Sequence, residues 1–221
     1  TWPCGRRAAL RLQVPCERQR ANPSVRVKLP RHAPGLRIGL FGGSFNPPHA
    51  GHRLVTLTAL HRLKLDRIWW IVTPGNPLKD TRGLPPLAER MAACRGLMPE
   101  PMVDITGFEA EIGTRYTLDT LRYLKHRCPK VQFVWIMGAD NLIQFHRWQG
   151  WREIAKLMPI VVVDRPGVTL KATASRTALA LSKGRVPPAK LFTRRPTKAP
   201  RWTFIHGPRS SLSSTALRRS G

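Results

Sequence analysis

Two histidines, His49 and His52, follow a pair of glycines in residues 38–52, which read IGLFGGSFNPPHAGH. An apolar run ends at Gly42 and Gly43, where a backbone without side chains can approach a ligand closely. The asparagine and two prolines that come next favour an extended bend before a helix. Positions three apart at a helix start share one face, so both imidazoles can face one ligand beside unpaired N–H groups. This spacing predicts an anion site, most naturally for phosphate.

The two imidazoles add a chemical prediction to this site. A histidine titrates near ~6.5, and a polyphosphate beside it favours the charged form. Two charged rings could stabilise negative charge that develops on a departing phosphate, which predicts a catalytic role for His49 and His52. The alternative interpretation is that they only cap the helix or bind a metal ion. The surrounding glycines and prolines favour the phosphate interpretation.

The elements that must position this site follow from residue 36 onward, where short apolar runs alternate with helix-length segments. Several runs are continuous Val, Ile and Trp, which is typical of strands buried on both faces. The strands are predicted at 37–41, 67–73, 102–106, 131–137, 160–163 and 202–205. The helices are predicted at 52–64, 87–97, 117–127, 151–157 and 173–182. This alternation predicts an α/β fold with a doubly wound parallel sheet, in which ligands bind beyond the carboxyl ends of the strands.

Charge and proline content divide the chain into two parts. The 221 residues carry 38 basic and 12 acidic side chains, a net charge of +26, which suits nucleic acid, anionic lipid or phosphorylated small molecules as partners. Residues 1–35 combine eight Lys or Arg with five prolines, which predicts a disordered basic extension before a domain at 36–221. Residues 184–200, also basic and rich in proline, are predicted to form a surface loop.

Cysteine spacing and hydropathy bound the cellular setting. The four cysteines form no CxxC pair and show no zinc spacing, which indicates reduced thiols in a cytoplasmic protein. No apolar run approaches the ~20 residues of a membrane span. We therefore expect a cytoplasmic protein without a membrane partner.

Two motifs in this chain resemble the signatures of one enzyme superfamily. The stretch GGSFNPPHAGH resembles the first signature of the nucleotidyltransferases, and His49 to His52 match its HxGH element. The stretch SSTALR at residues 213–218 resembles the second signature and follows in the same order. A Ser-Ser-Thr run that opens a helix also supplies free N–H groups and hydroxyls for phosphate, with Arg218 one turn further on. Taken by itself, this run is more typical of an ordinary capped helix with a solvated arginine.

Within that superfamily, residues 37–218 are most similar to the bacterial nicotinate-nucleotide adenylyltransferases. Family-like segments lie at 74–79, 115–121, 138–142 and 146–148. The resemblance implies a Rossmann-like nucleotidyltransferase fold and the transfer of an adenylyl group from ATP to nicotinate mononucleotide in NAD biosynthesis. It implies Mg²⁺ as the cofactor, bound mainly through the ATP phosphates, since no cluster of carboxylates stands out in the sequence.

The resemblance also implies three groups of site residues, with His49 and His52 as the catalytic pair. Those implied for ATP are Gly42, Gly43, Ser44, Phe45, Lys79, Gly138, Asp140, Arg165, Ser214, Thr215 and Arg218. Those implied for the mononucleotide are Asn46, Thr117 and Trp148. A carboxylate past the fourth strand, as at Asp140, suits ribose hydroxyls, and a flat indole suits a pyridine ring. The alternatives are core packing for Trp148 and plain solvent exposure for Lys79.

Direct in-line attack by the mononucleotide phosphate fits this set, because no Ser-His-Asp grouping or lone activated cysteine suggests a protein nucleophile. Two other interpretations stay open. One is a relative of the same superfamily that uses nicotinamide mononucleotide or phosphopantetheine as the acceptor. The other is a basic nucleic-acid-binding protein, against which the scattered basic residues and the absence of a finger or helix-turn-helix signature argue.

Overall fold

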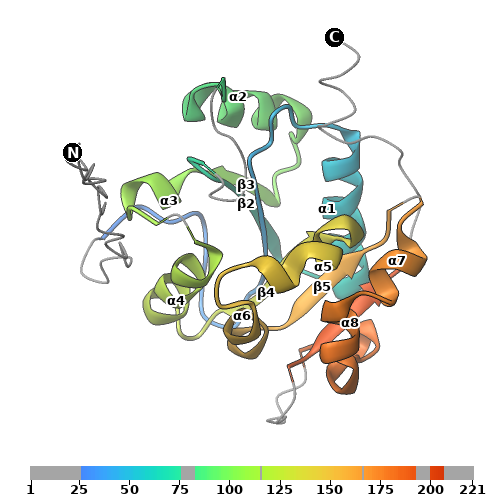
Figure 1. The fold of residues 1–221 in the computed structure, drawn as a ribbon. Coiled ribbons are helices and arrows are strands. Elements are labelled where there is room, and N and C mark those ends of the chain that lie inside the picture. Colours follow the sequence, from blue (N-terminus) through green and yellow to red (C-terminus); the bar gives the residue numbers. More distant parts are fainter. Residues whose placement is uncertain (1–25, 76–82, 115, 166, 193–199, 207–221) are drawn as a thin grey trace, which may run out of the picture.

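The computed structural model describes residues 26–206 except 76–82, 115, 166 and 193–199, and it contains one parallel sheet of six strands (Figure 1). The strands are β1 (Arg37–Gly43), β2 (Arg67–Val72), β3 (Val103–Thr106), β4 (Gln132–Gly138), β5 (Ile160–Val163) and β6 (Trp202–Ile205). Their order is β3-β2-β1-β4-β5-β6. The chain builds the sheet outward from β1 to β3 and then returns to β4, so the strand order reverses between β1 and β4. The predicted doubly wound α/β fold is confirmed.

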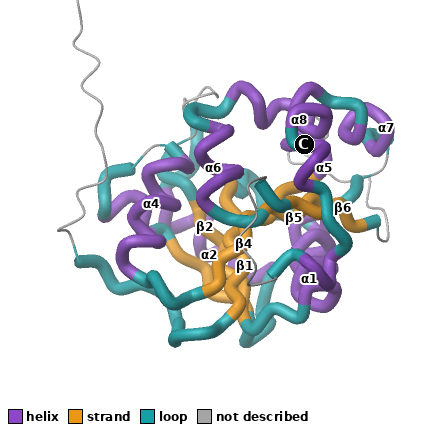
Figure 2. The backbone as a smooth tube through the Cα atoms, turned by 90° about the horizontal axis from the view of Figure 1, so that it is seen from below, coloured by secondary structure: helices purple, strands orange, loops and turns teal. Residues whose placement is uncertain are grey.

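Helices cover both faces of the sheet, as Figure 2 shows for α1 on one side and for α4 and α6 on the other. One face packs against α1 (Ala50–Leu63) and α2 (Leu87–Leu97). The opposite face packs against α3 (Phe108–Glu111), α4 (Thr117–Arg127), α5 (Ala139–Gln144), α6 (Trp151–Leu157), α7 (Thr169–Thr173) and α8 (Arg176–Ala180). Two separate hydrophobic cores result, one on each side of the strands.

Strand β2 explains why the apolar runs are continuous rather than alternating. Trp69 and Trp70 are both 0% exposed, yet they belong to the cores on opposite faces because successive side chains of a strand point to opposite sides. The indole N–H of Trp70 donates to Thr56 Oγ1 at 2.8 Å, which ties β2 to α1. A strand buried on both faces needs apolar residues at every position.

The structure differs from the sequence prediction at several places, of which three concern more than the end of a strand. The helix predicted at 173–182 is shortened to α8 (Arg176–Ala180), because Ser175 caps α8 by accepting from the Ala178 N–H at 3.2 Å, and the separate helix α7 ends at Thr173. The first helix begins at Ala50 rather than at residue 52. The surface loop predicted at 184–200 is wrong at Leu191, which is 0% exposed and packs in the core beside α1.

The end of the predicted N-terminal extension contacts the domain. Residues 1–25 lie outside the described part of the chain, whereas residues 26–35 form a loop. Val27 and Leu29 are partly buried against the core, and the Gly35 N–H donates to the carbonyl of Lys130 at 2.9 Å. The domain boundary at residue 35 stays a prediction. Because residues 27–35 contact the domain, deletions that end before and after this segment would test it.

Among the described helices, none is both long enough and apolar enough to cross a membrane.

Candidate active site

The carboxyl ends of β1, β4 and β5 bring several of the predicted site residues together. These strands are neighbours in the sheet, so the turns that follow them share one edge. Past β5, Arg165 Nε lies 3.4 Å from Asp140 Oδ1, which follows β4. Both groups act electrostatically on His49, which follows β1. At Gly138 a Cβ would come within 2.5 Å of Asp140 Oδ1 and 3.0 Å of Arg165 Nε, so only glycine leaves this pair undisturbed.

The two histidines cap helix α1 reciprocally. His49 is the N-cap residue, with an extended backbone, and its Nδ1 accepts from the Gly51 N–H at 3.1 Å. In return, the backbone N–H of His49 donates to Nδ1 of His52 at 3.2 Å. The ring centroids are 3.8 Å apart. Because both Nδ1 atoms accept hydrogen bonds, each neutral ring carries its proton on Nε2. The two histidines therefore do cap the helix, as the alternative interpretation predicted. The same hydrogen bonds hold their two Nε2–H donors side by side.

The charge expected on His49 is not present in the free protein. Burial, with a smaller contribution from the nearby Arg165, lowers the pKa of His49 to about 4, although Asp140 acts in the opposite direction. His49 is therefore neutral near pH 7 when no ligand is bound, and its charged form beside a polyphosphate stays a prediction. A neutral ring can still donate from Nε2, so the pair can act as hydrogen-bond donors without a proton gain.

The glycine turn sits directly on aromatic core residues. A Cβ at Gly42 would lie 2.6 Å from the ring of Trp135, so no side chain fits there. Phe45 adopts a left-handed backbone with φ of 45° and is 2% exposed. Its ring stacks on Trp70, with centroids 4.6 Å apart, and contacts the ring of His52 at 4.9 Å. The Phe45 side chain therefore packs in the core against Trp70 and His52, which leaves its backbone to meet a ligand.

Two of the three residues implied for the mononucleotide, Thr117 and Trp148, lie at the start of α4 and in the turn before α6. Thr117 opens α4, and Tyr116 at the N-cap makes no side-chain cap bond among the described residues. A Cβ at Gly150 would lie 2.3 Å from Leu118, so this turn packs tightly against the start of α4. Trp148 is half-buried, with its ring edge-on to Trp135 at 6.1 Å and to Phe145 at 5.3 Å.

Other predicted residues fall in the turn after β1 or beyond the described chain. Ser44 and Asn46 are half-buried in the turn between β1 and α1. The residues Lys79, Ser214, Thr215 and Arg218 lie outside the described residues. Their assignment to ATP therefore stays a prediction.

Sequence reasoning missed Asp164, a buried carboxylate at the end of β5. It is 2% exposed, and its Oδ1 accepts from the Arg165 N–H at 2.9 Å and from Thr169 Oγ1 at 2.7 Å. Its Oδ2 lies 3.3 Å from Nδ1 of His206, which follows β6. These bonds orient the backbone at Arg165. An acidic residue at the carboxyl end of a predicted strand was the signal that could have found it.

Sequence reasoning also missed Glu109 and Arg90, which are 8% and 4% exposed. The carboxylate of Glu109, in α3, accepts from Thr120 Oγ1 at 2.7 Å and from the side chain of Thr73. Burial raises the pKa of Glu109 to about 7. An acidic residue on a short helix and an arginine within α2 carry no sequence signal of burial, because both types are usually exposed.

The cysteines and the metal prediction are tested only in part. Cys94 and Cys128 are buried free thiols, and burial raises both pKa values, that of Cys94 to about 12. Neither thiol is activated as a nucleophile. Within the described ranges, no group of three or more His, Cys, Asp or Glu side chains could hold a metal ion.

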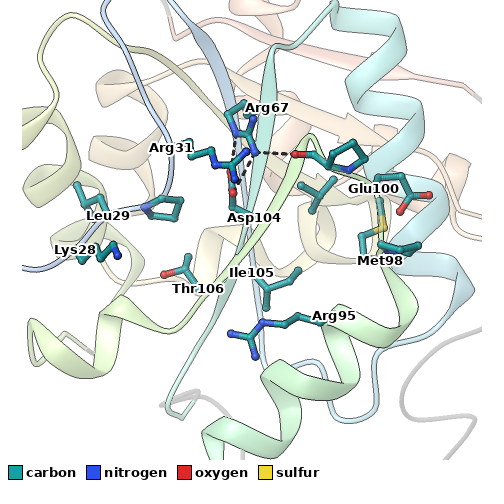
Figure 3. A pocket seen from close by; sticks show the side chains of 14 residues that line it. Lys28, Leu29, Arg31, Arg67, Arg95, Met98, Glu100, Asp104, Ile105 and Thr106 are labelled. Carbon is teal, nitrogen blue, oxygen red and sulfur yellow. Dashed lines mark hydrogen bonds and ion pairs between the residues drawn. The ribbon is translucent and has the colours of Figure 1, made fainter.

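A second concave region lies beside the edge strand β3 (Figure 3). It is a cavity of about 720 Å³, and none of its lining residues belongs to the predicted site. The segment with Lys28 and Arg31 forms one side, and α2 with Arg95 forms the other. Arg67 binds Asp104 with a fork at 2.7 and 3.1 Å.

Comparison with known proteins connects this geometry to a family. A family model described as cytidylyltransferase-like matches residues 40–220. A probable nicotinate-nucleotide adenylyltransferase of Methylorubrum extorquens is 58% identical over 183 residues, which cover 83% of this chain and 99% of the relative. The similarly named protein of Mesorhizobium japonicum is 56% identical over 193 residues, which cover 86% of this chain and 98% of the relative.

A solved structure shares the fold. Plasmodium falciparum nicotinic acid mononucleotide adenylyltransferase complexed with NaAD superposes with a TM-score of 0.63 at 17% identity, covering 83% of each chain. At that identity the likeness concerns the fold alone. The family match and the close relatives together establish that the chain belongs to the cytidylyltransferase-like family and, within it, to the nicotinate-nucleotide adenylyltransferases.

Proposed function

We propose that this enzyme transfers the adenylyl group of ATP to nicotinate mononucleotide and releases pyrophosphate, as one step of NAD biosynthesis. The observation that carries the proposal is the reciprocal capping of His49 and His52, which holds two Nε2–H donors at the carboxyl edge of the sheet. The relatives' shared name, at 56–58% identity over almost their whole length, supports the choice of substrates.

The proposed reaction is a single in-line displacement. A phosphate oxygen of the mononucleotide forms a bond to the α-phosphorus of ATP, while the bond from that phosphorus to the bridging oxygen of pyrophosphate breaks. Negative charge then gathers on the departing pyrophosphate. His49 and His52 face this charge with preorganised Nε2–H donors, and no covalent intermediate with the protein forms.

We assign the remaining described residues by their positions. Gly42, Gly43, Ser44 and the Phe45 backbone line the phosphate turn. Asp140 and Arg165 form the ion pair beside His49, and Gly138 leaves room for it, which suits the ribose and adenine of ATP.

On the acceptor side, Trp148 offers a flat ring for the pyridine, and the uncapped N–H groups from Thr117 suit the pyridine carboxylate. Asn46 is assigned a position between the two substrates. Lys79, Ser214, Thr215 and Arg218 complete the proposed ATP site.

A divalent cation, which we take to be Mg²⁺, would accompany ATP. Asp140 is a single carboxylate already paired with Arg165, and the described residues offer no set of three ligands. We therefore assign the cation to the ATP phosphates and water, where it would neutralise phosphate charge. No step of the mechanism relies on a metal held by the protein.

One assay tests the proposal against its alternatives. The purified full chain is mixed with ATP and, in turn, nicotinate mononucleotide, nicotinamide mononucleotide or phosphopantetheine, and both pyrophosphate and the coupled product are measured. We expect the largest kcat/KM with nicotinate mononucleotide. A larger value with another acceptor would reassign the substrate. Absence of transfer with all three, together with salt-sensitive DNA binding that survives deletion of residues 1–35, would favour the nucleic-acid interpretation.

A further inference from the structure

Arg90 is a buried cation beside the phosphate turn, and the mechanism above leaves it unused. It lies in α2 and is 4% exposed. Its Nη1 donates to the carbonyl of Ser44 at 2.8 Å and to that of Thr73 at 2.9 Å, and its Nε donates to the carbonyl of Pro85 at 2.9 Å. One guanidinium thus joins the turn after β1, the end of β2 and the segment before α2.

This guanidinium has carbonyl partners but no acidic partner within the described residues. Burial lowers the pKa of Arg90, as expected for a charge removed from water. Carbonyl dipoles offset only part of that cost, and a buried charge without a counter-charge is rarely retained for stability alone. The missing negative charge is what an ATP triphosphate would supply.

The contact with Ser44 also fixes the direction of a backbone donor. In a trans, planar peptide the C=O and the following N–H point in opposite directions. Because the Ser44 carbonyl points toward Arg90, the Phe45 N–H of the same peptide unit points away from Arg90. That N–H has no acceptor within the described part of the chain. The neighbouring strand adds a second constraint, since the Thr73 N–H donates to the carbonyl of Gly43 at 3.0 Å.

We propose that Arg90 is a positioning residue for the ATP phosphates: it turns the Ser44–Phe45 peptide so that the Phe45 N–H faces the triphosphate, and its own unneutralised charge favours that anion. This inference rests on the proposed function for the identity of the anion. It adds a residue from α2, outside both sequence motifs, to the phosphate site.

Two substitutions separate this role from plain stabilisation. Arg90→Met keeps much of the length but removes charge and donors, and Arg90→Lys keeps the charge but cannot reach three carbonyls at once. The matched control is Arg95→Met, five residues further along α2, where the side chain is exposed. For each full-length variant, ATP binding is measured by calorimetry without acceptor, kinetics are measured for both substrates, and thermal melting checks the fold.

We expect Arg90→Met to weaken ATP binding at least about tenfold while the KM for nicotinate mononucleotide stays within about twofold. Arg90→Lys should recover part of the affinity, and Arg95→Met should match the wild type. In protein labelled with ¹⁵N at phenylalanine, the Phe45 amide signal should shift with ATP in the wild type and not in Arg90→Met.

Equal losses for both substrates, or a lower melting temperature with unchanged ATP binding, would show that Arg90 is only structural. If Arg90→Met does not fold, Arg90→Lys decides: an ATP Kd within twofold of the wild type overturns the proposal. Failure of the proposed function would give a different result. The wild-type enzyme itself would then transfer no adenylyl group to nicotinate mononucleotide, and the Arg90 variants would not change that.

Discussion

The two basic regions of the molecule, the carboxyl edge of the sheet and the cavity beside β3, differ in how their side chains are held. At the carboxyl edge, His49 and Arg90 are each 4% exposed and are fixed by hydrogen bonds to backbone. Beside β3, Arg67 is paired with Asp104, but Lys28, Arg31 and Arg95 are exposed, and no hydrogen bond or ion pair to another described residue fixes their side chains.

The difference shows that charge alone does not mark a site in this chain. A net charge of +26 spreads cations over much of the surface, so an open basic cavity is expected by composition. Preorganised donors are rarer, because each must be buried and bonded in one orientation before a ligand arrives. The following predictions test this contrast from the largest expected effect to the smallest.

Loss of a fixed donor should have the largest effect. We expect His52→Ala to lower kcat by about 10²–10³ with a smaller change in the KM for ATP, because one preorganised donor to the leaving group is removed. His49→Ala should behave similarly. Steady-state kinetics with circular dichroism on each variant is the measurement, and His126→Ala, on the exposed side of α4, is the control.

The His52 variant also removes the acceptor for the His49 N–H, so capping and chemistry must be separated. His52→Asn offers a short acceptor near the cap but no Nε2–H donor. It should regain part of the melting temperature lost in His52→Ala without regaining kcat. If His52→Ala keeps its kcat, the histidine is a cap and nothing more.

A buried carboxyl near the site predicts a pH-dependent stability. The pKa of Glu109 is raised from 4.5 to about 7, so between these values the unfolded chain has released a proton that the folded chain retains. The free energy of unfolding therefore falls as pH rises through this window. Glu109→Gln removes that titration, so from pH 5 to pH 8 the variant should gain up to roughly 3 kcal/mol relative to the wild type.

Urea unfolding at the two pH values measures this change. Glu89→Gln, at an exposed position on α2, is the control and should show no such gain. A difference between Glu109→Gln and the wild type that is the same at pH 5 and pH 8 would mean that Glu109 is ionised in the folded protein throughout.

A half-buried aromatic residue should have a moderate and selective effect. Trp148→Ala is expected to raise the KM for nicotinate mononucleotide about two- to tenfold, since stacking contributes roughly 0.5–1.5 kcal/mol, and to leave the KM for ATP nearly unchanged. Trp148→Phe, which keeps a flat ring, should lie closer to the wild type. Equal loss for both substrates, or a lower melting temperature with normal kinetics, would place Trp148 in the core beside Trp135 and Phe145.

The N-terminal segment should have the smallest effect on activity. Two deletions test this, one of residues 1–25 and one of residues 1–35, which also removes Lys28 and Arg31. Both should leave the rate of adenylyl transfer within about twofold, a change of under ~0.5 kcal/mol in the activation free energy. Only the longer deletion should lower the melting temperature, because it removes the contacts of Val27 and Leu29 with the core. A tenfold loss of activity would show that the β3 cavity contributes to catalysis.

Much of the fold could be predicted from the sequence because buried strands leave a strong pattern. The runs at 160–163 and 202–205 match β5 and β6 at both ends, and the helices at 87–97, 117–127 and 151–157 match α2, α4 and α6. The late start of α8 inside the range predicted at 173–182 was not predicted, since a serine within a helical pattern becomes a cap only when the chain turns there.

The candidate site could be predicted only as far as its motifs. The pairing of His49 with His52 follows from spacing, but their tautomers depend on which backbone N–H each ring meets. Arg90 is 46 residues from its acceptor Ser44 and 17 residues from its acceptor Thr73, so no local sequence pattern predicts these hydrogen bonds. The burial of Glu109 likewise depends on distant residues, because its hydrogen-bond donors are Thr73, after β2, and Thr120, in α4.

In the reciprocal cap, the rings of His49 and His52 both stabilise the start of α1 and face the proposed phosphate site. Acid should therefore affect helix stability and activity together. The Gly51 amide is bonded to Nδ1 of His49, which can accept only while unprotonated. Below a pH of about 4, where His49 gains its proton, the first turn of α1 loses this bond and should fray. Amide exchange at Gly51 would then rise at the same pH at which activity falls, so acid inactivation would begin as local unfolding at one helix end, before the sheet is affected.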